Sequence, residues 1–149
     1  PAGVAVGPRS HQASYGVQTT GELVMNNGTL TVPADSENRI YVGFYAGSPG
    51  VGGSLHPRLT LNGGLIQMIS PDKGFFLGHN DGKDDSNASA ELVVNGGAIH
   101  IASGMQFAYA AGDCSKTNVS TVTMNGGEIV LGKYARGGNW KEKSMPFRF

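Results

Sequence analysis

Apolar and polar residues alternate in four short segments of the chain, and each segment runs directly into a glycine-containing turn. The segments begin at Leu23, Leu59, Leu92 and Val122, and each places its second apolar residue two positions later. Successive side chains of a β-strand point to opposite faces of the sheet. The alternation therefore predicts four strands that turn one face toward a common interior and the other toward solvent.

The four segments form a repeat. The asparagines that end them lie at positions 26, 62, 95 and 125, which gives spacings of 36, 33 and 30 residues. A second alternating segment follows each turn, at residues 29–32, 65–68, 98–101 and 128–131. A third apolar segment comes later, at residues 40–43, 75–78 and 105–108, and residues 4–7 match it. Periods of this length are typical of solenoids, propellers and repeat arrays.

The turn between the first and second segments carries an Asn and one or two glycines in every repeat. Glycine adopts positive φ at little steric cost, so these pairs can turn the chain through a corner where a branched side chain would clash. The predicted corner residues are Asn26, Gly28, Asn62, Gly64, Asn95, Gly97, Asn125 and Gly127. In a hairpin the same pairs would reverse the chain, and this keeps a hairpin array open as an alternative.

Three strands in each repeat predict an all-β fold, a short parallel β-solenoid (a right-handed β-helix) of about four coils. The solenoid is expected over residues 1–138, with a basic C-terminal tail over residues 139–149. A propeller is less favoured, because its blades need four strands and about 40 residues or more. No segment shows a helical period of apolar residues, so we expect no substantial helix.

The repeat pattern is an Asn-Gly-Gly corner followed by Ile or Leu, and a later aromatic strand that ends in Val-Gly or Leu-Gly. Over about residues 4 to 138 this pattern resembles the repeats of right-handed β-helix passenger regions in bacterial autotransporters and of pectin-lyase-like surface proteins. The resemblance implies the fold, and we expect an extracellular or cell-surface location. Such folds host adhesins, tailspikes and polysaccharide-cleaving enzymes alike, so the resemblance does not specify an activity.

The balance of charges argues against two classes of partner. Eleven basic residues match eleven acidic ones, whereas a general binder of nucleic acid or of anionic membranes needs a basic excess. The balance is uneven along the chain, because residues 133–149 hold five basic residues against Glu142 alone. No apolar run is long enough for a membrane span. The lone cysteine, Cys114, cannot form a disulfide within the chain.

The candidate chemistry is sparse, and we expect no catalysis and no cofactor apart from calcium. Asp81, Asp84 and Asp85 form the densest acidic cluster, in the loop after the third strand of the second repeat. Such oxygen ligands suit Ca²⁺, although the spacing matches no calcium motif and an ordinary polar loop is the alternative. His79 lies two residues from Asp81 and could form an acid-base pair with it. His100 should point to solvent, because Ile99 and Ile101 occupy the opposite face.

Aromatic residues and glycosylation-type triplets are the remaining features of the surface. The aromatics either stack coil upon coil against the core or form an exposed strip for carbohydrate. These residues are Phe44, Tyr45, Tyr109, Tyr134 and Trp140. The triplets begin at Asn27, Asn87 and Asn118. Asn27 is the least plausible acceptor of the three, because it lies in a tight corner.

The two ends of the solenoid suggest self-assembly. The repeat begins with a third strand, while Gly132 follows Asn125 so closely that one strand of the last coil should be missing or merged. Head-to-tail stacking would then complete a coil and produce an open filament. The residues expected at this contact are Val4, Val6, Ile129, Leu131, Trp140, Phe147 and Phe149.

The sequence therefore favours a noncatalytic extracellular structural protein that assembles with itself into a filament or surface layer. Three alternatives remain: a glycan-binding adhesin or tailspike-like segment, a fragment of a polysaccharide lyase or hydrolase, and a piece of a longer passenger whose other coils are not included.

Overall fold

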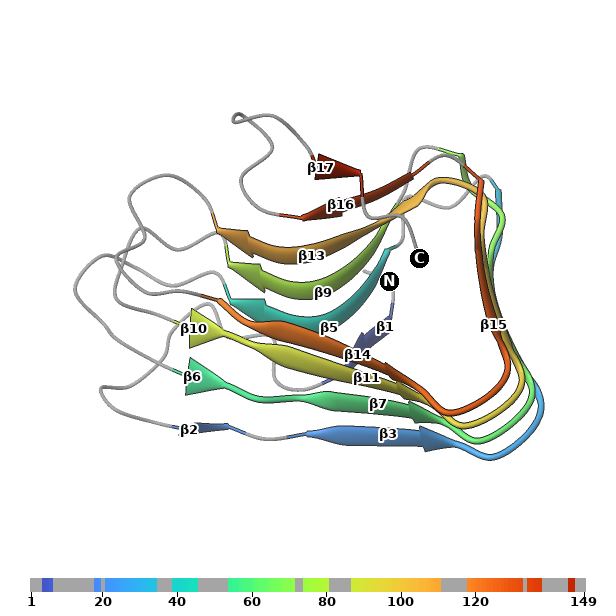
Figure 1. Cartoon of the computed structure of the whole chain (residues 1–149), viewed down its shortest axis with the longest axis horizontal. Coiled ribbons are helices and arrows are strands. Elements are labelled where there is room, and N and C mark those ends of the chain that lie inside the picture. The colour runs from blue at the N-terminus through green and yellow to red at the C-terminus, as the bar shows by residue number, and fades with distance from the viewer. Residues whose placement is uncertain are drawn as a thin grey trace.

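A computed structural model of the chain describes residues 4–6, 18–19, 21–34, 39–45, 54–71, 74–80, 87–110, 118–132, 134–137 and 145–146. Within these ranges the regular elements are all strands. The strands build a parallel β-solenoid of about four coils with three strands in each coil, as the repeat predicted (Figure 1). The expectation of substantial strand content and no helix is confirmed for this part of the chain.

Each position in the coil forms its own parallel sheet. The first-strand sheet contains β3 (Glu22–Met25), β7 (Arg58–Leu61), β11 (Ala90–Val94) and β14 (Ser120–Met124). The second-strand sheet contains β4 (Thr29–Val32), β8 (Leu65–Met68), β12 (Ala98–Ile101) and β15 (Glu128–Leu131). The third-strand sheet contains β1 (Val4–Val6), β5 (Ile40–Tyr45), β9 (Phe75–Asn80), β13 (Gly104–Ala110) and β16 (Tyr134–Gly137).

Two smaller features were not predicted. The two-residue strands β2 (Gln18–Thr19), β6 (Ser54–Leu55) and β10 (Asn87–Ala88) form a short parallel sheet ahead of the first strands. Strand β17 (Met145–Pro146) pairs with β16 in the antiparallel sense. Part of the predicted basic tail therefore lies along the last third strand of its own chain.

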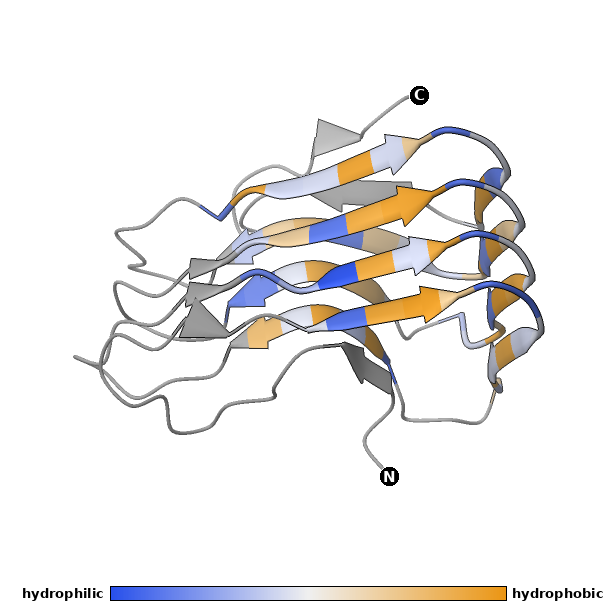
Figure 2. Ribbon diagram, turned by 90° about the horizontal axis from the view of Figure 1, so that it is seen from below, coloured by the Kyte–Doolittle hydropathy of each residue, from blue (hydrophilic) through white to orange (hydrophobic). Residues whose placement is uncertain are grey.

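The interior is a set of columns in which like residues stack from coil to coil. Leu23, Leu59, Leu92 and Val122 occupy one column in exact Cα register, as the alternation predicted. Apolar residues recur at matching places in successive strands, and the corners are hydrophilic (Figure 2). The central members of the columns are almost fully buried: Leu61, Leu92, Val94, Ile99 and Leu77 have no exposed surface. Burial of these columns against one another is the main stabilising term of the fold.

The prediction that the last coil lacks a separate strand is wrong. The expected missing or merged strand is present as β16, which pairs in register with β13. Two residues separate β15 from β16, and two also separate β12 from β13, so the last coil repeats the third one. The error arose because the third strand of the final repeat, at Tyr134 to Gly137, has lost most of its apolar character. Gly137 stands in register with Phe107, and Ala135 stands in register with Met105.

The third strands bend at one position. Gly43 and Gly78 both have positive φ there, and the same position in β13 is taken by Ala108, with φ of 46°. The neighbouring residues keep their register on either side, Val42 with Leu77 and Phe44 with His79. Ala108 therefore adopts a left-handed backbone conformation at a position that glycine occupies in the two preceding coils.

Replacing Ala108 with glycine is expected to stabilise the protein by about 0.5–1 kcal/mol. Relief of the left-handed conformation outweighs the extra entropy that glycine gives to the unfolded chain. Urea denaturation of the two proteins measures the difference. Ala98→Gly, in the regular strand β12, is the matched control and should lower the stability. A loss of stability in both variants would contradict this account of the bend.

Candidate functional site

The corners between first and second strands repeat closely from coil to coil. Gly28, Gly64, Gly97 and Gly127 all have positive φ, between 78° and 94°. At the inner corners the backbones of successive coils lie in direct contact. A Cβ atom added to Gly97 would lie 2.5 Å from the carbonyl oxygen of Gly64. Around Gly28, by contrast, the same atom would meet no atom within 4 Å in the part of the chain that the structure describes.

The four corner asparagines form a hydrogen-bonded ladder along the stack. The side-chain Nδ2 of Asn62 donates to Oδ1 of Asn26 at 2.8 Å, Asn95 donates to Asn62 at 2.7 Å, and Asn125 donates to Asn95 at 2.7 Å. Every bond runs from a later coil to the preceding one. The ladder therefore has a direction, with the amide nitrogen of Asn26 at one end and the amide oxygen of Asn125 at the other.

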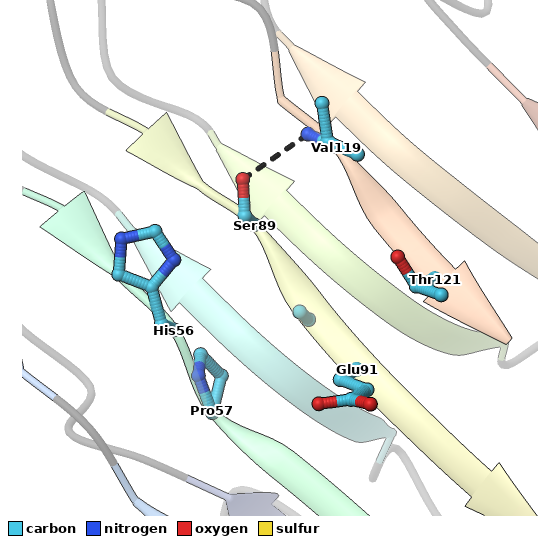
Figure 3. A pocket seen from close by; sticks show the side chains of 7 residues that line it. His56, Pro57, Ser89, Glu91, Val119 and Thr121 are labelled. Carbon is cyan, nitrogen blue, oxygen red and sulfur yellow. Dashed lines mark hydrogen bonds between the residues drawn. The ribbon is translucent and has the colours of Figure 1, made fainter. Parts of the chain in front are cut away.

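Polar side chains surround a groove on the outer face of the first-strand sheet, which we call the first-face groove. It consists of two adjoining hollows of about 430 and 370 Å³ that share His56 and Glu91. Figure 3 shows the second hollow, where residues from three successive coils converge. The lining residues used below are Glu22, His56, Arg58, Ser89, Glu91 and Val119.

The register of the strands places the charges of this groove. Glu22, Arg58 and Glu91 stand next to one another on β3, β7 and β11. Arg58 donates to Glu91 Oε2 through Nε at 2.7 Å and approaches the same oxygen through Nη2 at 2.6 Å. The pair is largely exposed, with 50% of the Arg58 side chain accessible, so its contribution to stability is about 0–1 kcal/mol. Its main effect is to fix the carboxylate of Glu91 beside the guanidinium of Arg58.

The far end of the groove mixes polar and apolar surface. The backbone N–H of Val119 donates to Ser89 Oγ at 3.1 Å, which ties the third coil to the fourth (Figure 3). The side chain of Val119 is 59% exposed. The groove thus offers hydroxyl, imidazole and carboxylate groups beside an apolar residue, a combination that suits binding of a polar ligand.

The aromatic residues of the third strands form a cluster of their own. The rings of Phe44, His79 and Tyr109 stack in turn, with centroids 5.3 and 4.5 Å apart and near-parallel planes. Tyr41 and Phe76 form a second stack at 5.0 Å beside them. Coil-upon-coil stacking is therefore confirmed for Phe44 and Tyr109, in preference to an exposed strip. Phe44 is 7% exposed and His79 is 8% exposed.

This placement changes the interpretation of His79. An acid-base pair with Asp81 would need an accessible imidazole, whereas the His79 ring is enclosed between two aromatic rings. Asp81, Asp84 and Asp85 lie outside the described residues, and the calcium site stays a prediction. Within the part of the chain that the structure describes, no three His, Cys, Asp or Glu side chains come together in a way that could hold a metal ion.

The second-strand sheet carries one polar pair on its outer face. His100 points outward, as predicted, and its Nε2 lies 2.8 Å from Glu128 Oε1. Both side chains are well exposed, at 43% and 60%. The pair joins the third and fourth coils. A hollow of about 250 Å³ near His100 is lined mainly by apolar side chains, among them Ile69 and Val130.

The glycosylation triplets and the tail residues also have defined places or fall outside the described ranges. Asn118 is 8% exposed, and its Nδ2, the atom that would carry a glycan, donates to the carbonyl of Tyr109 at 2.8 Å. Asn27 lies in the first corner, as expected, and is exposed there. Trp140, Phe147 and Phe149 lie outside the described residues. No described residue belongs to a helix with the length and apolar character needed to cross a membrane.

Sequence reasoning did not find the first-face groove. Its charged residues belong to different repeats and lie 33 or more positions apart, so only a full alignment of the repeats brings Glu22, Arg58 and Glu91 together. Comparisons with protein-family models, with curated proteins and with solved structures found no match to this chain.

Proposed function

We propose that the chain is a noncatalytic structural β-solenoid of an extracellular or cell-surface protein, and that it assembles with further copies of itself by coil stacking. The resemblance of its repeats to autotransporter passengers and pectin-lyase-like surface proteins supports this location. The observation that carries the proposal is the uncovered interior column at the last coil. Met124 is 44% exposed, whereas Leu61 and Val94 in the same column have no exposed surface.

The surface around Met124 is the same kind of surface that joins the coils within the chain. Ile129 and Leu131 of β15 are only partly buried, although Ile99 and Ile101 beneath them are 0% and 1% exposed. At the other end of the stack, Leu23, Met25 and Leu30 are likewise partly buried. A second copy that places its β3 against β14 and its β4 against β15 would extend these columns without a change of register.

The asparagine ladder supports the same orientation. Asn26 Nδ2 of the incoming copy would donate to Asn125 Oδ1 of the first copy, which continues the direction of the three bonds within the chain. In addition, the unpaired backbone groups of the edge strands β3 and β14 would pair with each other. Contacts between unlike surfaces need not close into a ring, so this stacking produces an open filament.

The third-strand sheet must rearrange for this stacking. The repeat pattern predicted instead that stacking would simply complete an unfinished last coil. In the described part of the chain, the third-strand sheet contains five parallel strands and β17, whereas each of the other two main sheets contains four strands. If β3 of a second copy follows β14, then β1 of that copy and β16 of the first copy require the same place. Assembly therefore needs β1 to leave β5, and β17 to leave β16, so that β16 can pair with β5 of the next copy.

Sedimentation velocity and negative-stain microscopy test the proposal. The full chain should form filaments in a concentration-dependent manner, and removal of residues 1–7 should promote them because β1 no longer competes. Met124→Lys should abolish assembly by placing a charge on the uncovered column. Thr123→Lys is the matched control, because it adds the same charge to the same strand on the outer face. Equal assembly of the two lysine variants, or a full chain that stays monomeric with and without residues 1–7, would contradict the proposal.

The first-face groove favours a second candidate function, that of a glycan-binding segment of a surface adhesin. Hydroxyl-rich ligands bind through a few fixed polar groups beside apolar surface, which is what His56, Arg58, Ser89 and Val119 offer. Binding of the full chain to a glycan array, and its loss in Arg58→Ala, would favour this function. Binding that is the same in both proteins would exclude this groove.

A further inference from the structure

Four Asn-Gly pairs stand at the corners, and they differ in their surroundings. In three of them the asparagine is the ladder residue itself, followed by Gly63, Gly96 or Gly126. The first corner has an additional residue: Asn26 is in the ladder, and Asn27 precedes Gly28. Asn27 is exposed and takes no part in the ladder. The four pairs thus have the same dipeptide chemistry in two distinct structural settings.

An Asn-Gly pair can deamidate by an intramolecular reaction. The backbone nitrogen of the glycine attacks Cγ of the asparagine side chain, forming an N–Cγ bond, and the Cγ–Nδ2 bond breaks. The proton lost by the backbone nitrogen leaves with Nδ2 as ammonia. Water then opens the cyclic imide at either carbonyl and gives aspartate or isoaspartate. Glycine allows this reaction best because it has no Cβ to hinder the ring, and water is the only other reactant.

We infer that Asn27, alone among the four, is a site of spontaneous deamidation in the folded protein. The backbone N–H of Gly28 donates to Oδ1 of Asn27 at 2.8 Å. Since Oδ1 is bonded to Cγ, this contact holds the attacking nitrogen beside the carbon it must reach. The corner is also open, because no described residue would come within 4 Å of a Cβ at Gly28. The chain can therefore close the imide there without displacing another coil.

The ladder asparagines are held away from this reaction. Nδ2 of Asn62, Asn95 and Asn125 each donate to the preceding coil, which orients the side chains along the stack. The attacking nitrogens are engaged as well: Gly96 N donates to the carbonyl of Leu61, and Gly126 N to that of Val94, both at 3.3 Å. All three glycines are also confined by the preceding coil, because a Cβ at Gly63, Gly96 or Gly126 would lie 2.7–2.8 Å from the carbonyl oxygen of the preceding ladder asparagine. Reaction at these corners requires local opening of the stack.

The product at Asn27 is compatible with the fold. Isoaspartate adds a methylene group to the main chain, and either product adds a negative charge. Both changes occur at the first corner, where a Cβ at Gly28 would meet no atom of the described residues within 4 Å. We expect the modified protein to remain folded and to accumulate. This inference concerns the unassembled chain, because in the proposed stack a corner of another copy would lie against Gly28. The measurement is therefore made on the monomeric protein.

A time course of peptide mass spectrometry in mildly alkaline buffer tests the inference. Asn27 should gain the mass change of amide-to-acid conversion at least about tenfold faster than Asn62, Asn95 and Asn125 in the folded protein. In denaturant the four sites should react at similar rates, because each is followed by glycine. Asn27→Gln should remove the fast site and leave the circular dichroism spectrum unchanged.

Two results would overturn it. Similar rates at all four sites in the folded protein, or a faster reaction at a ladder asparagine, would show that the ladder gives no protection. A fast Asn27 that stays equally ahead of the others in denaturant would show that its local sequence is the cause and the fold is not.

Discussion

Replacement of Gly97 by alanine is expected to destabilise the protein by about 3–5 kcal/mol, a large share of the stability of a domain of this size. Two effects add at this position. The backbone has φ of 80°, which an L-residue with a Cβ adopts at a cost, and the new atom would lie 2.5 Å from the carbonyl oxygen of Gly64 and 2.9 Å from the carbonyl carbon of Gly63. The corner would have to move away from the preceding coil, which breaks the stack in its middle. Denaturant unfolding followed by circular dichroism measures the loss.

Gly28→Ala is the matched control for this experiment. Gly28 has φ of 94°, so the conformational penalty is similar, but among the described residues a Cβ there would meet no atom within 4 Å. We expect a loss of about 1–2 kcal/mol at Gly28. Equal losses at the two positions would mean that the coils are not in contact at their corners, and the stacked arrangement would then be wrong.

Shortening Leu92 to alanine should cost about 3–4 kcal/mol, because the side chain is fully buried between Leu59 and Val122 and the tightly stacked strands cannot close the cavity. Leu23→Ala, in the same column on the edge strand β3, should cost only about 1–2 kcal/mol, since Leu23 is half-buried. Urea denaturation of the two variants provides the comparison. A larger loss at Leu23 than at Leu92 would contradict the order of the column.

The repeat could be predicted from the sequence because each coil uses the same few residues for the same physical task. The apolar pairs that begin at Leu23, Leu59, Leu92 and Val122 fill one column, and a glycine of positive φ turns each corner. A period of about 30 to 36 residues then leaves few folds besides a solenoid. The prediction was wrong where the local pattern weakened: β16 has Ala135 and Gly137 where its neighbour has Met105 and Phe107, so only its pairing identifies it.

The outer surface was harder to predict, because its contacts join residues of different coils. The pairing of Arg58 with Glu91 depends on strand register, which an incomplete alignment of the repeats did not provide. His79 stacks between Phe44 and Tyr109 because the three residues stand in register, one position after the bend at Gly43, Gly78 and Ala108. A bend of this kind has no signature in the alternation of apolar residues.

Distances between spin labels on the first-strand sheet test the central claim most directly. In a background with Cys114→Ser, cysteines would replace Val93 and Thr123, which face outward on the neighbouring strands β11 and β14, and in a second protein Val24 and Thr123, on the outermost strands. The solenoid predicts backbone separations of about 5 Å for the first pair and about 14 Å for the second. Strong dipolar broadening for Val93 with Thr123, and weaker broadening for Val24 with Thr123, is the expected result. Absence of broadening in the first pair would show that these segments do not lie side by side, and the solenoid would be refuted.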